Sequence, residues 1–256
     1  MEFPLLYSVK RFLRICDCLL TRKTQTIRCR TQTCRFFCTY WWNDVSQQIF
    51  DDEILPYFNA LGDFQPSVIL DIGAASGHFG IMASKVFDCE AIHAFEPARR
   101  QRILLNRNAQ LNKVNRLMVE PFGLWNRSDV LPFRTVGAES SFAPVSRFQG
   151  VLAFPEMLPV RTLDHWVEDK QITRIDLIKI DAEGAELEIL EGAQASLKRF
   201  RPRLLVQAYH IRNGARTFEQ CARTLESIGY AVREVQPGKG LLCAEPEPRM
   251  DLAYSA

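Results

Sequence analysis

The chain has 256 residues, of which 47% are apolar and 24% charged, so intrinsic disorder is not expected and one large globular domain can form. Its formal net charge is +2, but residues 1–42 hold eight basic residues against two acidic ones, a net of +6, which leaves −4 for the remainder. Basic character therefore belongs to the N-terminus. The rest of the chain lacks the positive charge typical of nucleic-acid-binding proteins, so no nucleic-acid partner is expected.

Residues 3–20, FPLLYSVKRFLRICDCLL, place apolar side chains at helical spacing with basic residues between them, which predicts an amphipathic helix. The helix either packs on its own domain or makes a peripheral contact with a membrane surface or a partner. Because lysine and arginine interrupt the segment, it resembles neither a cleavable signal nor a membrane span. We interpret residues 1–43 as a basic, cysteine-rich extension with this helix, and residues 44–256 as the main domain.

Five of the eight cysteines lie in this extension, without the paired C-x-x-C spacing of a zinc module: Cys16, Cys18, Cys29, Cys34 and Cys38. We interpret them as reduced thiols of a cytoplasmic protein. The threonine-rich segment 21–34 shows some strand-like alternation, but no structure is predicted for it.

From residue 44 onwards, helical and strand-like patterns alternate, beginning with a helix expected around 45–61. Expected strands cover 67–71, 90–96, 116–120, 175–181 and 203–209, and expected helices cover 77–87, 98–112, 184–199 and 215–228. Apolar strands separated by helices predict an α/β fold with a doubly wound, mostly parallel sheet covered on both faces. Two further strands, 230–235 and 240–243, are expected to form a terminal hairpin.

The stretch ILDIGAASGHFG, residues 69–80, runs from strand to helix, so Gly73 and Gly77 are expected in the ligand crevice beyond the first strand. The dinucleotide fingerprint G-x-G-x-x-G fails because Ala75 and His78 stand at its second and third glycine positions. A Rossmann oxidoreductase is therefore disfavoured.

The ligand that this region favours is S-adenosylmethionine. Asp71, near the strand end, would repel a pyrophosphate but suits a ligand with an ammonium and a sulfonium group. The next strand ends in AFEP, and its Glu96 can accept hydrogen bonds from both ribose hydroxyls. With the two glycines and the neighbouring Ala74 and Pro97, these carboxylates make up the predicted cofactor site.

Two aromatic segments follow the third strand. In PFGLWN, Phe122 is expected either to stack on the adenine, as a further cofactor residue, or to lie in the core. The irregular segment SSFAPVSRFQG, residues 140–150, is either a substrate loop that turns Phe142 and Phe148 toward the acceptor or a surface insertion.

The run IKIDAEGAELEILEGA follows, and the sequence here resembles the FkbM family of S-adenosylmethionine-dependent methyltransferases. The resemblance covers roughly residues 45–210 and includes ILDIGAASGHFG, HAFEP, a helix with Asn108 and Asn112, VRTLDHW and RPRLLVQAYH. It implies the class I methyltransferase fold, a Rossmann-like sheet of seven strands whose last strand inserts antiparallel to the others. It also implies O-methylation of a sugar, glycolipid or polyketide-like acceptor by residues 44–256.

Methyl transfer to a hydroxyl requires alignment and removal of a proton, so a general base is expected beside the acceptor. Asp181, after the fourth strand, is the first candidate, with an N-cap of the next helix as its structural alternative. Glu183 is another candidate, although with Glu186 it could simply favour the helix N-terminus. His210 is the third, because an ordinary histidine pKa of about 6.5 suits proton transfer at neutral pH.

Three further expectations concern neighbouring residues. Asp181, Glu183 and His210 are ligand types that magnesium or manganese accepts, but no local motif sets their geometry and no metal is predicted. Lys179, inside an apolar strand, is expected to have an acidic partner. Gln207 stands where FkbM relatives tend to have glutamate, so the alternative function is a catalytically impaired S-adenosylmethionine-binding or scaffold protein.

Overall fold

The computed structural model describes residues 24–37, 47–136, 139–142, 155–212 and 214–248. The helix predicted over residues 3–20 lies outside the described residues, so its contact with a membrane or partner stays a prediction. Within the described ranges, no helix combines the length and the apolar character needed to cross a bilayer.

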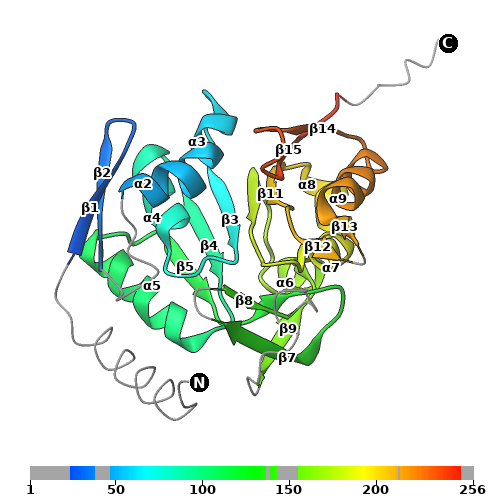
Figure 1. Cartoon of the computed structure of the whole chain (residues 1–256), viewed down its shortest axis with the longest axis horizontal. Coiled ribbons are helices and arrows are strands. Elements are labelled where there is room, and N and C mark those ends of the chain that lie inside the picture. The colour runs from blue at the N-terminus through cyan, green and yellow to red at the C-terminus, as the bar shows by residue number, and fades with distance from the viewer. Residues whose placement is uncertain (1–23, 38–46, 137–138, 143–154, 213, 249–256) are drawn as a thin grey trace, which may run out of the picture.

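A seven-stranded sheet forms the centre of the molecule (Figure 1). Its strands run in the spatial order β14 (Tyr230–Glu234), β15 (Leu241–Pro246), β11 (Arg203–Gln207), β10 (Leu177–Ile180), β3 (Val68–Ile72), β4 (Ala91–Phe95) and β5 (Leu117–Glu120). Pairing is parallel from β11 to β5, whereas β15 is antiparallel to both β11 and β14. The predicted doubly wound sheet and its antiparallel last strand are therefore confirmed.

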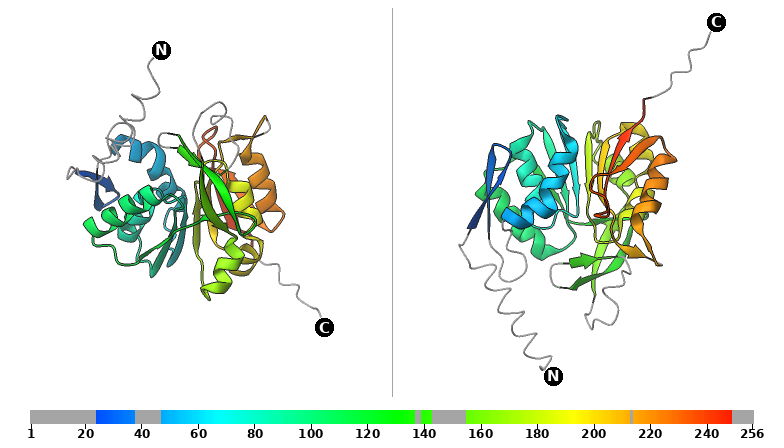
Figure 2. Two further views of the ribbon diagram at one scale, coloured as in Figure 1. Left: turned by 90° about the horizontal axis from the view of Figure 1, so that it is seen from below. Right: turned by 45° about the horizontal axis from the view of Figure 1, so that its top comes forward.

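Side chains of the central strands alternate between two apolar clusters because successive residues of a strand face opposite sides of the sheet. In β3, Ile69 joins the cluster that contains helices α3 (Leu55–Leu61) and α4 (His78–Val86). Leu70 and Ile72 join the cluster on the other face, with α6 (Leu163–Asp169) and α9 (Thr217–Glu226). Helices thus cover both faces of the sheet, as Figure 2 shows.

Two predicted helices are interrupted. The helix expected over 184–199 is split into α7 (Glu186–Glu191) and α8 (Gln194–Phe200). A Cβ at Gly192 would lie 2.1 Å from the Trp125 carbonyl oxygen, and the Asp164 carboxylate accepts the Ala195 and Ser196 N–H groups, which starts a new helix. These partners come from distant parts of the chain, so the local pattern did not reveal the break.

The helix expected around 45–61 consists of α2 (Gln47–Ile49), a π-helical turn η1 (Phe50–Ile54) and α3. Pro56 stands at the start of α3 and has no N–H group to donate, which favours a change of helical hydrogen bonding just before it. Helix α5 (Arg99–Leu111) lies where the sequence predicts a helix.

A second, four-stranded sheet occupies the region that the sequence left irregular, between β5 and β10. Its strands are β6 (Gly123–Leu124), β9 (Glu156–Arg161), β7 (Asp129–Val136) and β8 (Glu139–Ser141). Pro132 and Pro159 lie within two of these strands, and proline inside a run argues against a strand when only the sequence is read. Figure 1 shows this sheet at one end of the central sheet.

Strands β1 (Thr24–Cys29) and β2 (Gln32–Phe37) form a hairpin that packs beside α4 and α5 (Figure 2). Its buried Ile27 and Phe36 belong to the same apolar cluster as Ile81 of α4. The segment 24–37, which we assigned to the extension, therefore contributes to the core of the main domain in the structure. The cysteines of the described residues are buried free thiols, and burial raises the pKa of Cys34 to about 11.

Candidate functional site

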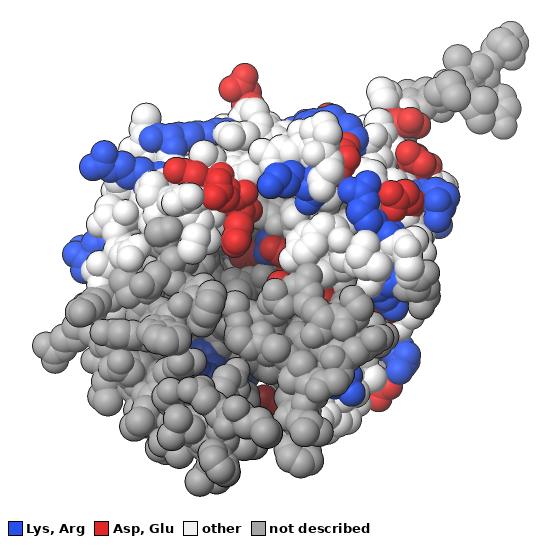
Figure 3. All heavy atoms as spheres, in the orientation of Figure 1, with Lys and Arg blue, Asp and Glu red and all other residues white. Residues whose placement is uncertain are grey.

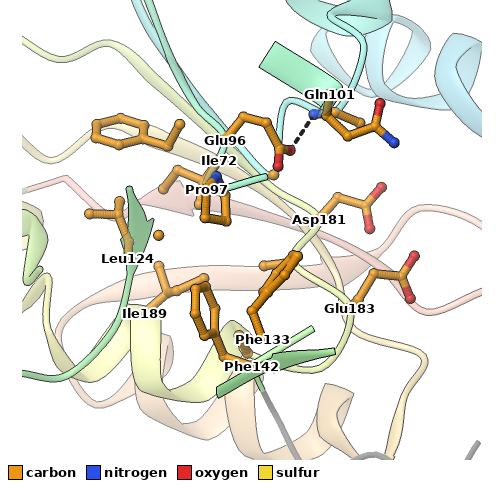
Figure 4. A pocket seen from close by; sticks show the side chains of 16 residues that line it. Ile72, Glu96, Pro97, Gln101, Leu124, Phe133, Phe142, Asp181, Glu183 and Ile189 are labelled. Carbon is orange, nitrogen blue, oxygen red and sulfur yellow. Dashed lines mark hydrogen bonds between the residues drawn. The ribbon is translucent and has the colours of Figure 1, made fainter. Parts of the chain in front are cut away.

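A cavity of about 140 Å³ lies at the carboxyl ends of β3, β4 and β10. Figure 4 shows its charged and apolar walls. The charged side chains of its lining are Glu96, Asp181 and Glu183. The apolar part of its lining includes Phe95, Leu124, Phe133 and Phe142. The ends of β4 and β10, which flank β3, thus bring three carboxylates to one cavity with an apolar opposite wall.

The turn between β3 and α4 supplies part of the cavity wall through its main chain. Gly73 has φ +72°, and a Cβ at this position would lie 1.9 Å from the Asp181 carbonyl oxygen. Glycine is therefore required here by the close approach of the chain after β10. Ala75 also adopts a left-handed conformation, with φ +47°, at a cost of about 1–2 kcal/mol for a residue with a Cβ.

Glu96 follows β4 and is only 6% exposed. Its two carboxylate oxygens accept the Ala75 N–H at 2.9 Å and the Ala98 N–H at 2.8 Å, which fixes the direction of the side chain. Burial raises the pKa of Glu96 to about 7, although these N–H groups act in the opposite direction. The ionised group retains lone pairs that can accept hydroxyl groups of a ligand.

Asp181 follows β10 and is half-buried at the cavity. Its Oδ2 accepts the hydroxyl group of Tyr57, from α3, at 3.1 Å. Tyr57 is buried, and burial together with the Asp181 charge holds its pKa well above the usual range, so it remains a donor. Helix α7 begins after Ala185 without a side-chain cap, so Asp181 does not serve as the N-cap that was its structural alternative.

Glu183 also lines the cavity, and it adopts a left-handed conformation with φ +54°. Its Oε2 lies 3.1 Å from Nε2 of His210, whose Nδ1 lies 3.5 Å from Oε1 of Glu186. Burial lowers the pKa of His210, but the two glutamates outweigh it and raise that pKa to about 9. A histidine protonated at neutral pH cannot accept a proton, so these contacts describe a side chain that positions Glu183.

Acidic side chains continue from the cavity to the surface. The pKa of Glu53, on η1, is raised by desolvation and by the charges of Asp181 and Glu183. In Figure 3, acidic side chains gather on this face of the molecule beside a hollow. The surroundings of Asp181 are therefore electronegative, which favours ligands with positive charge.

Residues 71–232 match the model of the methyltransferase FkbM domain, which is 162 of the 256 residues of the chain. The chain belongs to the FkbM methyltransferase family. Methyltransferase 1 of Beauveria bassiana (strain ARSEF 2860) is 23% identical over 189 residues, which cover 67% of this chain and 75% of that protein.

Solved structures of methyltransferases are also similar to this FkbM family member. A methyltransferase FkbM from Methylobacillus flagellatus KT matches 70% of the chain, with 22% identity and a TM-score of 0.48, and the match spans 42% of that protein. A ribosomal protein L11 methylase from Lactobacillus delbrueckii subsp. bulgaricus matches 79% of the chain and 81% of its own length, with 13% identity and a TM-score of 0.46.

Asp71 does not line the cavity of this FkbM protein. It is fully buried, accepts the Gly80 N–H at 3.2 Å and forms an ion pair of 3.2 Å with Lys179. The acidic partner predicted for Lys179 is thereby confirmed. Burial lowers the pKa of Lys179, but the charges of Asp71 and Asp181 outweigh it and raise that pKa, so Lys179 stays charged and donates to the Gly73 carbonyl at 3.0 Å.

Of the remaining predicted cofactor residues, two line the cavity and three do not. Gly73 and Pro97 line the cavity with Glu96. Ala74 packs beneath the turn, and Gly77 begins α4 with φ +86°. Phe122 lies in the core, which was the second alternative for this residue. Its ring centroid is 5.7 Å from that of Phe95, within an apolar cluster.

Residues at this site that the sequence did not predict include Tyr57, Gln101 and Phe133. Tyr57 has no local signal, because its partner Asp181 lies 124 residues away. Gln101 lies in the first turns of the predicted helix after Glu96, and helix periodicity could have placed it near the crevice. The expectation that Phe142 faces the acceptor side is consistent with its place in the cavity wall, whereas Phe148 lies outside the described residues.

Two further expectations from the sequence concern a metal site and Gln207. In the part of the chain that the structure describes, no set of three or more His, Cys, Asp and Glu side chains is arranged to hold a metal ion. Gln207 donates to the Lys239 carbonyl at 3.2 Å and does not line the cavity. The residue that motivated the alternative of a catalytically impaired protein thus does not line this cavity.

Proposed function

We propose that this FkbM family member is an S-adenosylmethionine-dependent O-methyltransferase whose acceptor is a hydroxyl group of a sugar, glycolipid or polyketide-like molecule. The observation that supports it most strongly is the position of two carboxylate sets in one cavity. Glu96 lies at the end of β4, and Asp181 with Glu183 lies beyond β10. The first suits a ribose, and the second suits an acceptor that must lose a proton.

The chain's residues fit the cofactor in three respects. Glu96 would accept the ribose hydroxyls, and the main chain at Gly73 and Ala75 would contact the amino acid portion. The acidic lining suits the positive charges of the ammonium and sulfonium groups. When bound, S-adenosylmethionine supplies an electrophilic methyl group.

The acceptor side would position a hydroxyl group and remove its proton. Asp181 is our candidate base, because it faces the cavity and the Tyr57 hydroxyl holds its carboxylate in one orientation. Glu183 is held by His210 and can bind a neighbouring hydroxyl group. Phe133 and Phe142, whose rings lie 4.7 Å apart, provide an apolar surface for one face of the acceptor. Alignment alone can lower the barrier by several kcal/mol.

The first test is calorimetric titration of S-adenosylmethionine, and separately of NAD, into the full chain. We expect S-adenosylmethionine to bind and NAD not to bind. Glu96→Ala should abolish binding, whereas the matched control Glu120→Ala should retain it, since Glu120 ends the next strand and contacts His93 away from the cavity. Binding of NAD alone would overturn the proposal.

The second test is transfer of a labelled methyl group to a panel of sugars, glycolipids and polyketide-like alcohols. Turnover that Asp181→Asn abolishes would support the enzyme. Cofactor binding without turnover on any acceptor would favour the alternative of a scaffold protein.

A further inference from the structure

The fully buried Asn108, on α5, joins the hairpin β1–β2 to the turn that lines the cavity. Its Oδ1 accepts the Phe37 N–H at 3.0 Å, and its Nδ2 donates to the Ser76 carbonyl at 2.9 Å. The partners define the orientation of the amide, because a backbone N–H must face the oxygen and a carbonyl must face the nitrogen. One side chain thus contacts both segments, which lie 39 residues apart in the chain.

Asn112 makes the comparable contact one helical turn later, but only to the hairpin and its own helix. Its Oδ1 accepts the Arg35 N–H at 2.7 Å, and its Nδ2 donates to the carbonyls of Arg35 and Asn108. Four residues of helix rise by about 6 Å, close to the 6.6 Å that separates alternate residues of a strand. The spacing of the two asparagines along α5 therefore matches the spacing of alternate residues along the outer edge of β2. Of the two, Asn108 also reaches the turn.

The turn needs such support because Ala75 is held in a left-handed conformation, with φ +47°, between its two glycines. Strained residues persist only where their surroundings determine them fully. Glu96 accepts the N–H of Ala75, and Asn108 binds the carbonyl of the next residue, Ser76. The strained residue, which lines the cavity, is thus fixed on both sides.

The hairpin adds to this support through its packing. Phe36 of β2 meets the ring of His78 edge-on at 4.6 Å, and His78 lies 3.1 Å from the Ser76 hydroxyl through its Nδ1. On the other edge of the hairpin, the Gln47 amide binds the N–H and carbonyl of Arg28. Both edges of this two-stranded ribbon are therefore closed by amide side chains, and the ribbon is anchored to the domain.

We propose that Asn108 is a positioning residue that holds the cofactor turn against the N-terminal hairpin and thereby sets the affinity for S-adenosylmethionine. This inference rests on the proposed function, because it assigns the turn to that cofactor. It makes the hairpin part of the binding machinery and not merely of the core.

The test compares Asn108→Ala with Asn112→Ala in the full chain, by calorimetric titration of S-adenosylmethionine well below the unfolding temperature. Both variants lose hydrogen bonds to the hairpin and should unfold at lower temperature. We expect Asn108→Ala to raise the Kd about tenfold and Asn112→Ala to change it less than about twofold. A merely structural role would lower both unfolding temperatures and leave the Kd of the folded protein unchanged.

Asn108→Asp separates the two contacts of this side chain. At pH 8 the carboxylate still accepts the Phe37 N–H but has no hydrogen to donate to the Ser76 carbonyl, so the Kd should rise as in Asn108→Ala. If Asn108→Ala does not fold, Asn108→Asp replaces it in the comparison with Asn112→Ala. An unchanged Kd in the folded Asn108 variants, or an equal rise in Asn112→Ala, would overturn the inference alone. Absence of binding by the unaltered chain would overturn the proposed function and this inference together.

Discussion

The two sides of the cavity are constructed differently. On the proposed cofactor side, Glu96 is fixed by main-chain N–H groups, one from Ala98 two residues later and one from Ala75 in the turn after the neighbouring strand β3. On the acceptor side, Asp181 and Glu183 are fixed by the side chains of Tyr57 and His210, which come from distant elements. The proposed cofactor side thus relies on main-chain donors at the ends of two neighbouring strands. The proposed acceptor side relies on side-chain contacts that form only when α3 and the segment after β11 pack against the end of β10.

The largest expected effect separates chemistry from cofactor binding. Asp181→Asn keeps the shape of the side chain but cannot accept a proton, so kcat should fall by about 10²- to 10⁴-fold. The Kd for S-adenosylmethionine should change by less than about threefold. Steady-state transfer to the best acceptor and calorimetry check both. If Glu183→Gln instead shows the large loss and Asp181→Asn does not, the base is Glu183.

The next effect concerns the support of the acceptor side. The pKa of His210 is about 9 in the folded protein, above its ordinary value of 6.5. Its ion pairs therefore stabilise the fold fully below about pH 6.5, and this contribution is lost as the pH rises through about 9. We expect His210→Gln to lower the free energy of unfolding by about 3 kcal/mol at pH 7 and by much less at pH 10.

Urea denaturation at both pH values, with the unaltered chain in parallel, measures this difference. The matched control is His165→Gln, because His165 is about half exposed and its ring contacts, with Asp169 and the Ser128 hydroxyl, lie at the surface. An equal penalty at pH 7 and pH 10 would show that His210 stabilises the site by packing and not by charge.

A smaller effect tests the cofactor side. Because the pKa of Glu96 is raised to about 7 by burial, the carboxylate is partly protonated at neutral pH. Ribose hydroxyls donate best to the ionised form, so the Kd for S-adenosylmethionine should rise by up to about tenfold per pH unit below 7 and level off above it. Calorimetry between pH 5.5 and 8.5 follows this dependence. Glu96→Gln should bind weakly with little pH dependence, and a strong remaining dependence would assign the titration to another group.

The smallest expected effect sharpens the contrast between main-chain support of Glu96 and side-chain support of Asp181. Tyr57→Phe removes one hydrogen bond to Asp181, worth about 0.5–1.5 kcal/mol, so kcat should fall by about 3- to 10-fold without a change in cofactor affinity. The control is Tyr230→Phe, because Tyr230 is a buried tyrosine that donates to the Leu197 carbonyl away from the cavity. Equal losses in both variants would mean that kcat responds to stability alone.

Much of the central sheet was predictable because buried parallel strands are continuous in apolar residues and glycines mark the turn. The predicted strands lie within a few residues of those observed, and Glu96 and Asp181 both face the cavity as expected. The second sheet was missed because Pro132 and Pro159 weaken the strand pattern. A carboxylate near a strand end predicts a ligand contact, so the sequence assigned Asp71 to the ligand. The ion pair of Asp71 with the buried Lys179 joins two strands, and the local sequence pattern does not predict such a pairing.

By itself the sequence determined the family, the order of strands and helices, and the strand ends that carry the carboxylates of the cavity. These features depend on contiguous residues, whose periodicity and turn chemistry are local. Only the tertiary structure decided which carboxylates face the cavity, which are held by ion pairs, and how the hairpin reaches the turn after β3. Hydrogen bonds such as those of Tyr57 to Asp181 and of Asn108 to Ser76 form between residues that folding alone brings together.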